Sequence, residues 1–164
     1  MASVELRGLT KRYGNQAVVD DVSLRIDHGL LVCLLGPSGC GKTTTLRMIA
    51  GLERATAGEV IIAGKNMNEL APEKRDIAMV FQFYALYPAL TVGQNIAMPL
   101  HFEKLSKDDM DKRVMKVAKI LHLTDVLDRL PGQVSEGEKQ RIAVARAIVR
   151  DPNCFLFDEP LSRL

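Results

Sequence analysis

Cysteine is scarce in this sequence, and its scarcity argues against two kinds of site. The three cysteines, Cys33, Cys40 and Cys154, are odd in number and unclustered. Neither a disulfide framework nor a zinc site is suggested by such a pattern. Thiols that are buried or lie in loops, in a reducing compartment, are the simpler interpretation.

Long apolar runs and a strong excess of one charge are missing as well. The longest purely apolar run covers residues 30–35, whereas a membrane-spanning helix needs about 20 residues. Residues 1–10 alternate like a strand and do not resemble a secretory leader. The formal net charge is only +2, which argues weakly against nucleic acid as a partner. We therefore expect a protein that is made and kept in the cytoplasm.

The composition that is present is that of a globular domain. Hydrophobic residues make up 47% of the chain and charged residues 26%. A length of 164 residues allows one domain with a core and is too short for two comfortable ones.

The first half of the chain reads as strands around one helix. Apolar alternation over residues 4–9 and 22–26 predicts half-buried antiparallel strands. The continuous apolar run 30–35 predicts a strand that is covered on both faces. A helix is predicted over Lys42–Ala50, ended by Gly51.

The second half combines helices with short strands. Short strands are expected over residues 60–62 and 77–81, and a buried strand over residues 154–157. Helical spacing of apolar residues follows a capping sequence at Ser106, and a second amphipathic helix is expected over residues 136–150. The fold class is therefore α/β: one core, residues 1–87 and 134–164, encloses a mostly helical insertion over residues 88–133.

The sequence from Gly36 to Thr43 is a complete G-x-x-x-x-G-K-T phosphate loop. Glycines let backbone N–H groups surround phosphate oxygens, and the helix that follows adds the positive end of its dipole. Lys42 is expected to reach the β- and γ-phosphates, and the Thr43 hydroxyl to bind Mg²⁺. The alternative is a chance glycine-rich turn. The strand predicted before this segment and the helix predicted after it both favour a phosphate loop instead. The predicted ATP contacts are Gly36, Ser38, Gly39, Cys40, Gly41, Lys42, Thr43 and Thr44.

An apolar strand that ends in Asp158 and Glu159 is the second chemical element. The carboxyl end of a strand is where an α/β sheet presents side chains to a ligand. Asp158 is expected to hold Mg²⁺, and Glu159 to orient or deprotonate the attacking water. By itself the Asp-Glu-Pro sequence could equally be a charged turn, and the phosphate loop favours the catalytic interpretation.

Taken in order, these motifs resemble the nucleotide-binding subunits of ABC transporters over essentially the whole chain. The similarity is greatest to importer ATPases that serve sugars and related solutes such as glycerol phosphate. The resemblance implies a P-loop core with a mixed sheet, an N-terminal antiparallel β part and an inserted helical subdomain. It implies that Tyr13 stacks on adenine. It also implies that Gln82 senses Mg²⁺ and water with a catalytic role, beside the docking groove for the membrane subunits.

Residues 134–138, Val-Ser-Glu-Gly-Glu, occupy the place of the family's signature, usually Leu-Ser-Gly-Gly-Gln. There, Ser135 and Gly137 of one subunit would contact the γ-phosphate held by another, so that ATP joins a dimer. Glu136 and Glu138 replace a glycine and a glutamine, and their charge opposes an incoming phosphate. Alternatively, Ser135 only caps a helix with an acidic first turn.

The resemblance also implies partners and a location. The expected partners are a second copy or another paired ABC ATPase subunit, integral permease subunits and, indirectly, a solute-binding protein. The protein would sit peripherally on the inner face of the cell membrane. Because residue 164 precedes the family's next loop aspartate and its switch histidine, we expect a C-terminally truncated copy with an incomplete sheet. A binding module with little or no hydrolysis, and a soluble ABC-type ATPase of DNA repair or translation, remain the alternatives.

Overall fold

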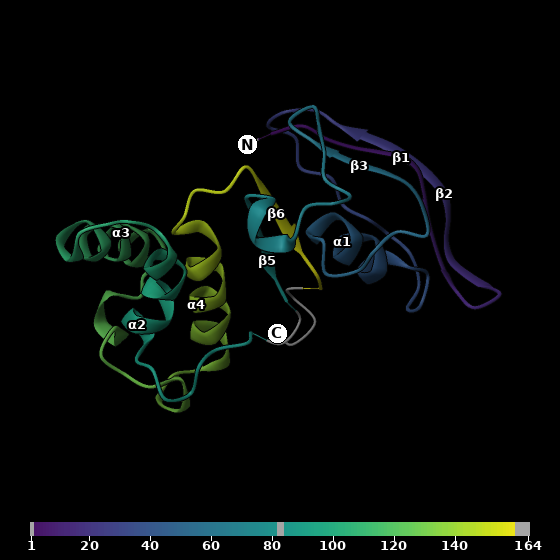
Figure 1. Cartoon of the computed structure of the whole chain (residues 1–164). Helices are drawn as coiled ribbons and strands as arrows, with labels where there is room; N and C mark the ends of the chain where they lie inside the picture. The colour runs from purple at the N-terminus through teal and green to yellow at the C-terminus, as the bar shows by residue number, and fades with distance from the viewer. Residues whose placement is uncertain (1, 82–83, 160–164) are drawn as a thin grey trace. The chain divides into compact units, whose positions relative to one another are not determined.

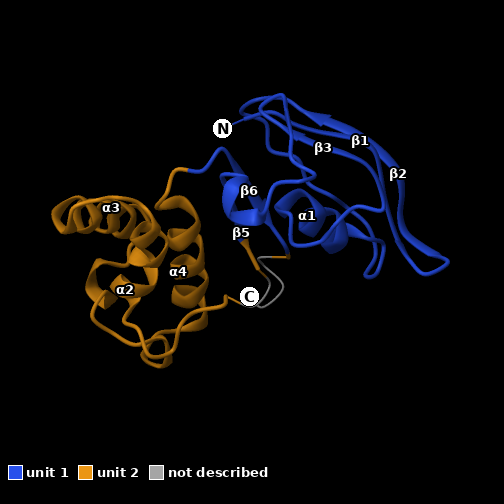
Figure 2. Cartoon of the chain, viewed as in Figure 1, with its two compact units in different colours: residues 1–79, 152–158 blue, residues 80–151, 159–164 orange. Residues whose placement is uncertain are grey.

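The computed structural model describes residues 2–81 and 84–159, and the chain divides into two compact units (Figures 1 and 2). Unit 1 comprises residues 1–79 and 152–158, and unit 2 comprises residues 80–151 and 159–164. The helical insertion expected over residues 88–133 lies within unit 2, which also contains the helix α4 (Glu136–Ile148).

Unit 1 contains a four-stranded antiparallel sheet in the order β2-β1-β3-β4. Its strands are β1 (Val4–Tyr13), β2 (Gln16–Ile26), β3 (Ala57–Ile62) and β4 (Lys65–Asn66). The antiparallel strands expected near the N-terminus are confirmed, and both are longer than predicted. The added residues run into the turn at Gly14, where polar residues interrupt the apolar alternation that marks a strand in the sequence.

The helix predicted after the phosphate loop is confirmed as α1 (Lys42–Ala50). Gly51 ends it in the left-handed conformation, with φ 79°. Two further strands, β5 (Ile77–Val80) and β6 (Cys154–Phe157), form a second sheet. The core of unit 1 joins side chains of β1, β3, α1 and β6, among them Leu9, Ile62, Met48 and Leu156.

The strand predicted over residues 30–35 is wrong. None of these residues belongs to a strand, and Leu31 and Leu35 are 92% and 88% exposed. A continuous apolar run indicates a buried strand only where hydrogen-bonded strands lie on both sides of it. Within residues 2–81 and 84–159, neither sheet includes this segment as a member. The turn before it is present, because the Leu30 amide donates to the Asp27 carbonyl at 3.2 Å.

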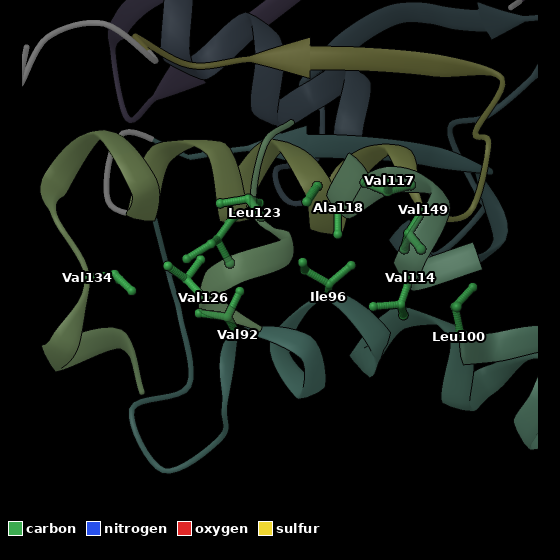
Figure 3. Packing of buried hydrophobic residues seen from close by; sticks show 12 residues of the cluster. Val92, Ile96, Leu100, Val114, Val117, Ala118, Leu123, Val126, Val134 and Val149 are labelled. Atoms are coloured by element: carbon green, nitrogen blue, oxygen red, sulfur yellow. The ribbon is translucent and has the colours of Figure 1, made fainter. Parts of the chain in front are cut away.

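Unit 2 is helical. Its longer elements are α2 (Val92–Ala97), α3 (Lys107–Ile120) and α4, and 3-10 turns connect them at η2 (Met98–Phe102), η3 (Thr124–Val126) and η4 (Pro131–Gln133). Ser106 caps α3 as predicted, since its side chain accepts from the Asp109 amide. One apolar cluster fills the unit, with Ile96, Val114 and Val149 among its buried members (Figure 3). In the described part of the chain, no helix has the length and apolar character needed to cross a bilayer.

A buried arginine holds the C-terminal end of α1 in unit 1. Arg75, at the end of the 3-10 turn η1 (Pro72–Lys74), is only 6% exposed. Its guanidinium donates to the carbonyl oxygens of Met48, Ile49 and Leu70, each at 2.9 Å. The last carbonyls of a helix have no partner within the helix, and they carry the negative end of its dipole. Arg75 supplies both the hydrogen bonds and the positive charge that this end requires.

Replacing Arg75 by methionine should therefore destabilise the protein strongly. Arg75→Met keeps an unbranched apolar stem but removes the guanidinium that donates to three carbonyls, and we expect a loss of about 2–4 kcal/mol. Urea unfolding followed by circular dichroism measures this. Arg7→Met is the matched control, because the Arg7–Glu5 pair is exposed and such pairs contribute about 0–1 kcal/mol. Equal losses in the two variants would contradict the assigned role of Arg75.

Candidate functional site

The phosphate loop is an exposed turn in which Lys42 folds back on the backbone. Its ammonium donates to the carbonyl oxygens of Gly36 at 2.8 Å and Pro37 at 2.9 Å, and Cys40 Sγ lies 3.8 Å away. Ser38, Gly39 and Cys40 are exposed around this arch. A lysine held at the mouth of a loop by weak acceptors can exchange them for a phosphate, which is a stronger acceptor.

Packing against β2 dictates the identity of Gly41. A Cβ at this position would lie 2.6 Å from the Val18 carbonyl oxygen and 3.1 Å from Val19 Cγ2, and φ is +92°. Only glycine allows this approach at this backbone angle. The loop is thereby pressed against β2, and α1 begins at Lys42 with no side chain capping its free N–H groups. Thr43 and Thr44 lie in the first turn of α1 behind the loop.

A hydrogen bond joins the first turn of α1, directly after the loop, to the end of β6. The Thr43 hydroxyl donates to Asp158 Oδ1 at 2.7 Å, across 115 positions of the sequence. Asp158 is buried, with 6% of its surface exposed. The sequence predicted both residues as metal ligands, and the structure brings their oxygens together.

These two oxygens suit a magnesium ion in part. A hydroxyl and a carboxylate are hard donors, and Mg²⁺ usually combines one or two such groups with water and substrate phosphates. Among residues 2–81 and 84–159, no cluster of three or more His, Cys, Asp or Glu side chains could hold a metal without such help. The donor set therefore fits a metal that arrives with a phosphate ligand.

Tyr13 lies at the end of β1, paired with Gln16 of β2, and half of it is exposed. Gly41 touches β2 at Val18, two residues beyond Gln16. Because a strand rises about 3.3 Å per residue, the tyrosine and the phosphate loop contact neighbouring parts of one strand. Unit 1 thus carries an exposed aromatic ring on the strand that supports the loop.

The predicted signature residues lie at the start of α4 in unit 2, where they form a complete capping box. The Ser135 hydroxyl and the Ser135 amide each donate to Glu138 Oε2 at 2.7 Å. In return, the Glu138 amide donates to Ser135 Oγ at 3.3 Å. The hydrogen bonds from Ser135 lower the pKa of the Glu138 carboxyl. The structure thus shows that Ser135 caps α4.

The other acidic residue of this segment is also paired. Glu136 Oε1 lies 2.6 Å from Lys139 Nζ, so its charge is partly neutralised within the first turn of α4. A Cβ on Gly137 would meet nothing nearer than Arg141 Nη1 at 3.9 Å. Glycine is therefore not required by the packing of α4 at this position.

Two of the predicted catalytic residues are Gln82 and Glu159. Gln82 lies outside the residues that the structure describes. Glu159 directly follows Asp158, is exposed and has a φ of +48°, a conformation that non-glycine residues adopt infrequently.

The sequence interpretation missed two residues that organise the segment after Gln82. Arg146, on α4, donates to the Ala85 carbonyl at 2.6 Å, and its guanidinium lies 5.3 Å from the centre of the Tyr87 ring. Burial lowers the pKa of Arg146. Asn95 is fully buried and bonds both the amide and the carbonyl of Tyr87, at 2.8 and 3.0 Å. The sequence did contain a sign of the role of Arg146, because it is a charged residue inside the otherwise apolar run of residues 142–149.

Comparison with known proteins identifies the family. A family model described as ABC transporter matches residues 19–162. The xylose/arabinose import ATP-binding protein XacJ of Haloferax volcanii is 54% identical over the whole of this chain and 43% of its own length. The trehalose import ATP-binding protein SugC of Mycobacterium tuberculosis is 56% identical, over 42% of its length. The sn-glycerol-3-phosphate import ATP-binding protein UgpC of Ruegeria pomeroyi is 52% identical, over 47%.

A solved structure agrees with these sequence matches. The ATP-binding cassette MJ0796, in a dimeric post-hydrolysis state bound to ADP and Pi, superposes with a TM-score of 0.87 and 35% identity. The match covers 98% of this chain and 75% of that one. The fold is thus the α/β fold of ABC ATPases, as predicted, and the chain belongs to the ABC transporter family. It spans less than half the length of the curated relatives named above.

The capping box at α4 makes the titration of Glu138 a direct test of its geometry. The pKa of Glu138 should lie below its ordinary value of 4.5, because two Ser135 donors favour the charged form. The contribution of these hydrogen bonds to the stability of the folded protein is thus complete above pH 4.5. It is lost as the pH falls through the lowered pKa of Glu138. Carboxyl-carbon NMR titration measures this value. Ser135→Ala, which removes the hydroxyl donor, should move the pKa back toward 4.5, and an unchanged pKa would contradict the hydrogen bond.

Proposed function

We propose that this chain is the nucleotide-binding part of an ATPase that powers the import of a small solute, a sugar or a related compound. Its substrate is ATP with Mg²⁺. The observation that carries the proposal is the hydrogen bond of 2.7 Å between Thr43 and Asp158, next to the lysine of the phosphate loop. In this arrangement a phosphate-binding lysine and two hard oxygen donors serve a single ligand.

Lys42 would exchange its two backbone carbonyls for the β- and γ-phosphates, and its charge would offset theirs. The free N–H groups at the start of α1 would bind the same phosphates, together with the loop residues Gly36 to Gly41. Thr43 and Asp158 would open their mutual hydrogen bond to hold magnesium. Bound there, magnesium neutralises charge on the transferring phosphate.

Glu159 would act on the attacking water. Its position directly after Asp158 places a second carboxylate next to the metal-binding one in the sequence, and a carboxylate can orient or deprotonate water. Gln82 would contribute a further contact to magnesium and water. Tyr13 would stack on the adenine from the end of β1.

Hydrolysis would require two copies, or this chain and a paired ABC ATPase subunit. Ser135 and Gly137 of one copy would contact the γ-phosphate bound by the other. Because the Ser135 hydroxyl donates to Glu138, an incoming phosphate has to replace that carboxylate as the acceptor. The closure of the dimer would therefore have to break the hydrogen bond from Ser135 to Glu138. It would also have to overcome the repulsion between the incoming phosphate and the carboxylates of Glu136 and Glu138.

Import would proceed through separate integral permease subunits, with a solute-binding protein delivering the solute. The protein would then work in the cytoplasm, peripherally on the inner face of the membrane. The three relatives are named as import ATP-binding proteins, which favours this role over one in DNA repair or translation. These names cite different solutes at similar identity, so we assign the choice of solute to the permease and the solute-binding protein. Residues 1–87 and 134–164 would form the nucleotide-binding core, and residues 88–133 the helical subdomain.

The role of Glu159 separates an ATPase from a module that only binds ATP. Glu159→Gln should bind ATP as the parent does but lose about 10²–10⁴-fold in turnover, because an amide cannot accept the proton. Phosphate release and equilibrium ATP binding measure the two properties. Glu69→Gln is the matched control, since this carboxylate is exposed outside the site. Parental turnover in Glu159→Gln would assign the base to another residue, and absence of turnover in the parent would favour the binding module.

A further inference from the structure

The ring of Tyr13 is supported by a cation. Lys11 Nζ lies 4.9 Å from the centre of the Tyr13 ring, within the distance of a cation–π contact. Tyr13 itself is 51% exposed, so ring surface that Lys11 does not cover remains open to solvent.

Lys11 is held in this position by groups that follow α1. Its ammonium lies 2.5 Å from Glu53 Oε1 and donates to the Arg54 carbonyl at 2.8 Å. The side chains of Lys11 and Glu53 are only 12% and 28% exposed, in contrast to most ion pairs of this chain. The hydrogen bond from Lys11 lowers the pKa of Glu53, and a side-chain hydrogen bond from Tyr13 acts in the same direction. Glu53 thus holds the ammonium of Lys11 beside the Tyr13 ring.

This cluster also connects Tyr13 to the helix of the phosphate loop. The Glu53 amide donates to the Arg47 carbonyl of α1 at 3.2 Å. Two residues after Arg54, the Thr56 amide donates to the Thr10 carbonyl of β1 at 2.8 Å. The segment between α1 and β3 is therefore fastened to the helix at one end and to β1 at the other.

From this geometry we propose that Lys11 and Glu53 are positioning residues for the base of the bound nucleotide. They fix the orientation of the Tyr13 ring relative to α1, and so the distance between the stacking surface and the phosphate loop. The cation below the ring also offsets the negative charge of its π face, which favours a purine stacked on the opposite side. The inference rests on the proposed function, because it assumes that the base of the nucleotide reaches Tyr13.

The test compares ATP with inorganic tripolyphosphate, which offers the phosphates without the base. Equilibrium dissociation constants of both are measured for the full chain and its variants. Tyr13→Ala should weaken ATP binding about tenfold and leave tripolyphosphate binding unchanged. Lys11→Met should weaken ATP binding about threefold, also without effect on tripolyphosphate. In the Tyr13→Ala background, Lys11→Met should have no further effect on ATP, because the ring that it positions is gone.

Two variants serve as controls. Lys11→Arg keeps the cation and should restore most of the ATP affinity. Arg12→Met removes a neighbouring cation of β1 whose exposed partner is Asp20, and it should leave both affinities unchanged. If Lys11→Met does not fold, Glu53→Gln replaces it in the same comparison, since it weakens the hold on Lys11 with little change in volume.

Each contrary result has its own meaning. Equal losses for ATP and tripolyphosphate in Lys11→Met would show a general structural role and overturn the proposal. An unchanged ATP affinity in Lys11→Met would also overturn it. So would a further loss of ATP affinity when Lys11→Met is added to Tyr13→Ala. Should tripolyphosphate binding be insensitive to Lys42→Ala, the proposed function itself would fail, whatever Lys11 does.

Discussion

The hydrogen bond from Thr43 to Asp158 joins the two segments on which the nucleotide site depends, the first turn of α1 and the end of β6. It is possible because β6 packs through Leu156 into the core that also receives Met48 and Ile49 of α1. A buried carboxylate requires a partner, and in this chain the partner is the hydroxyl that a magnesium ion would share with it. The fold therefore holds together the two oxygens that we propose as metal ligands.

Contacts at both ends of the helix α1 place the short glycine-rich loop that precedes it. At its start, Gly41 lies against the Val18 carbonyl, where no side chain fits. At its end, Arg75 bonds the Met48 and Ile49 carbonyls. Beyond the end, Glu53 holds Lys11 and so connects the helix to β1. A ligand that binds at the start of α1 would therefore meet a loop that these contacts hold in place, and pre-organisation of this kind reduces the entropy lost on binding.

Local sequence predicted α1, its terminal glycine and the cap of α3, and it offered the cap of α4 as an alternative, because each depends on residues within a few positions of one another. It failed at residues 30–35, where strand formation depends on partners distant in the sequence. The contacts of Lys11 with Glu53 and of Arg75 with α1 could not be predicted either. Lysine and arginine are usually solvated, and nothing local marks Lys11 as tightly paired or Arg75 as buried. The resemblance supplied Tyr13, whose support by Lys11 only the structure reveals.

The central claim is that Thr43 and Asp158 hold one magnesium ion together with ATP. It is tested most directly by ATP affinity with and without Mg²⁺ in the parent, Thr43→Val, Asp158→Asn and the double variant. The account predicts that Mg²⁺ strengthens binding in the parent and that each single change removes most of this gain. The double variant should then lose no more than the larger single loss, because both residues serve one ion. Additive losses, or a gain from Mg²⁺ that survives in all three variants, would contradict a shared site.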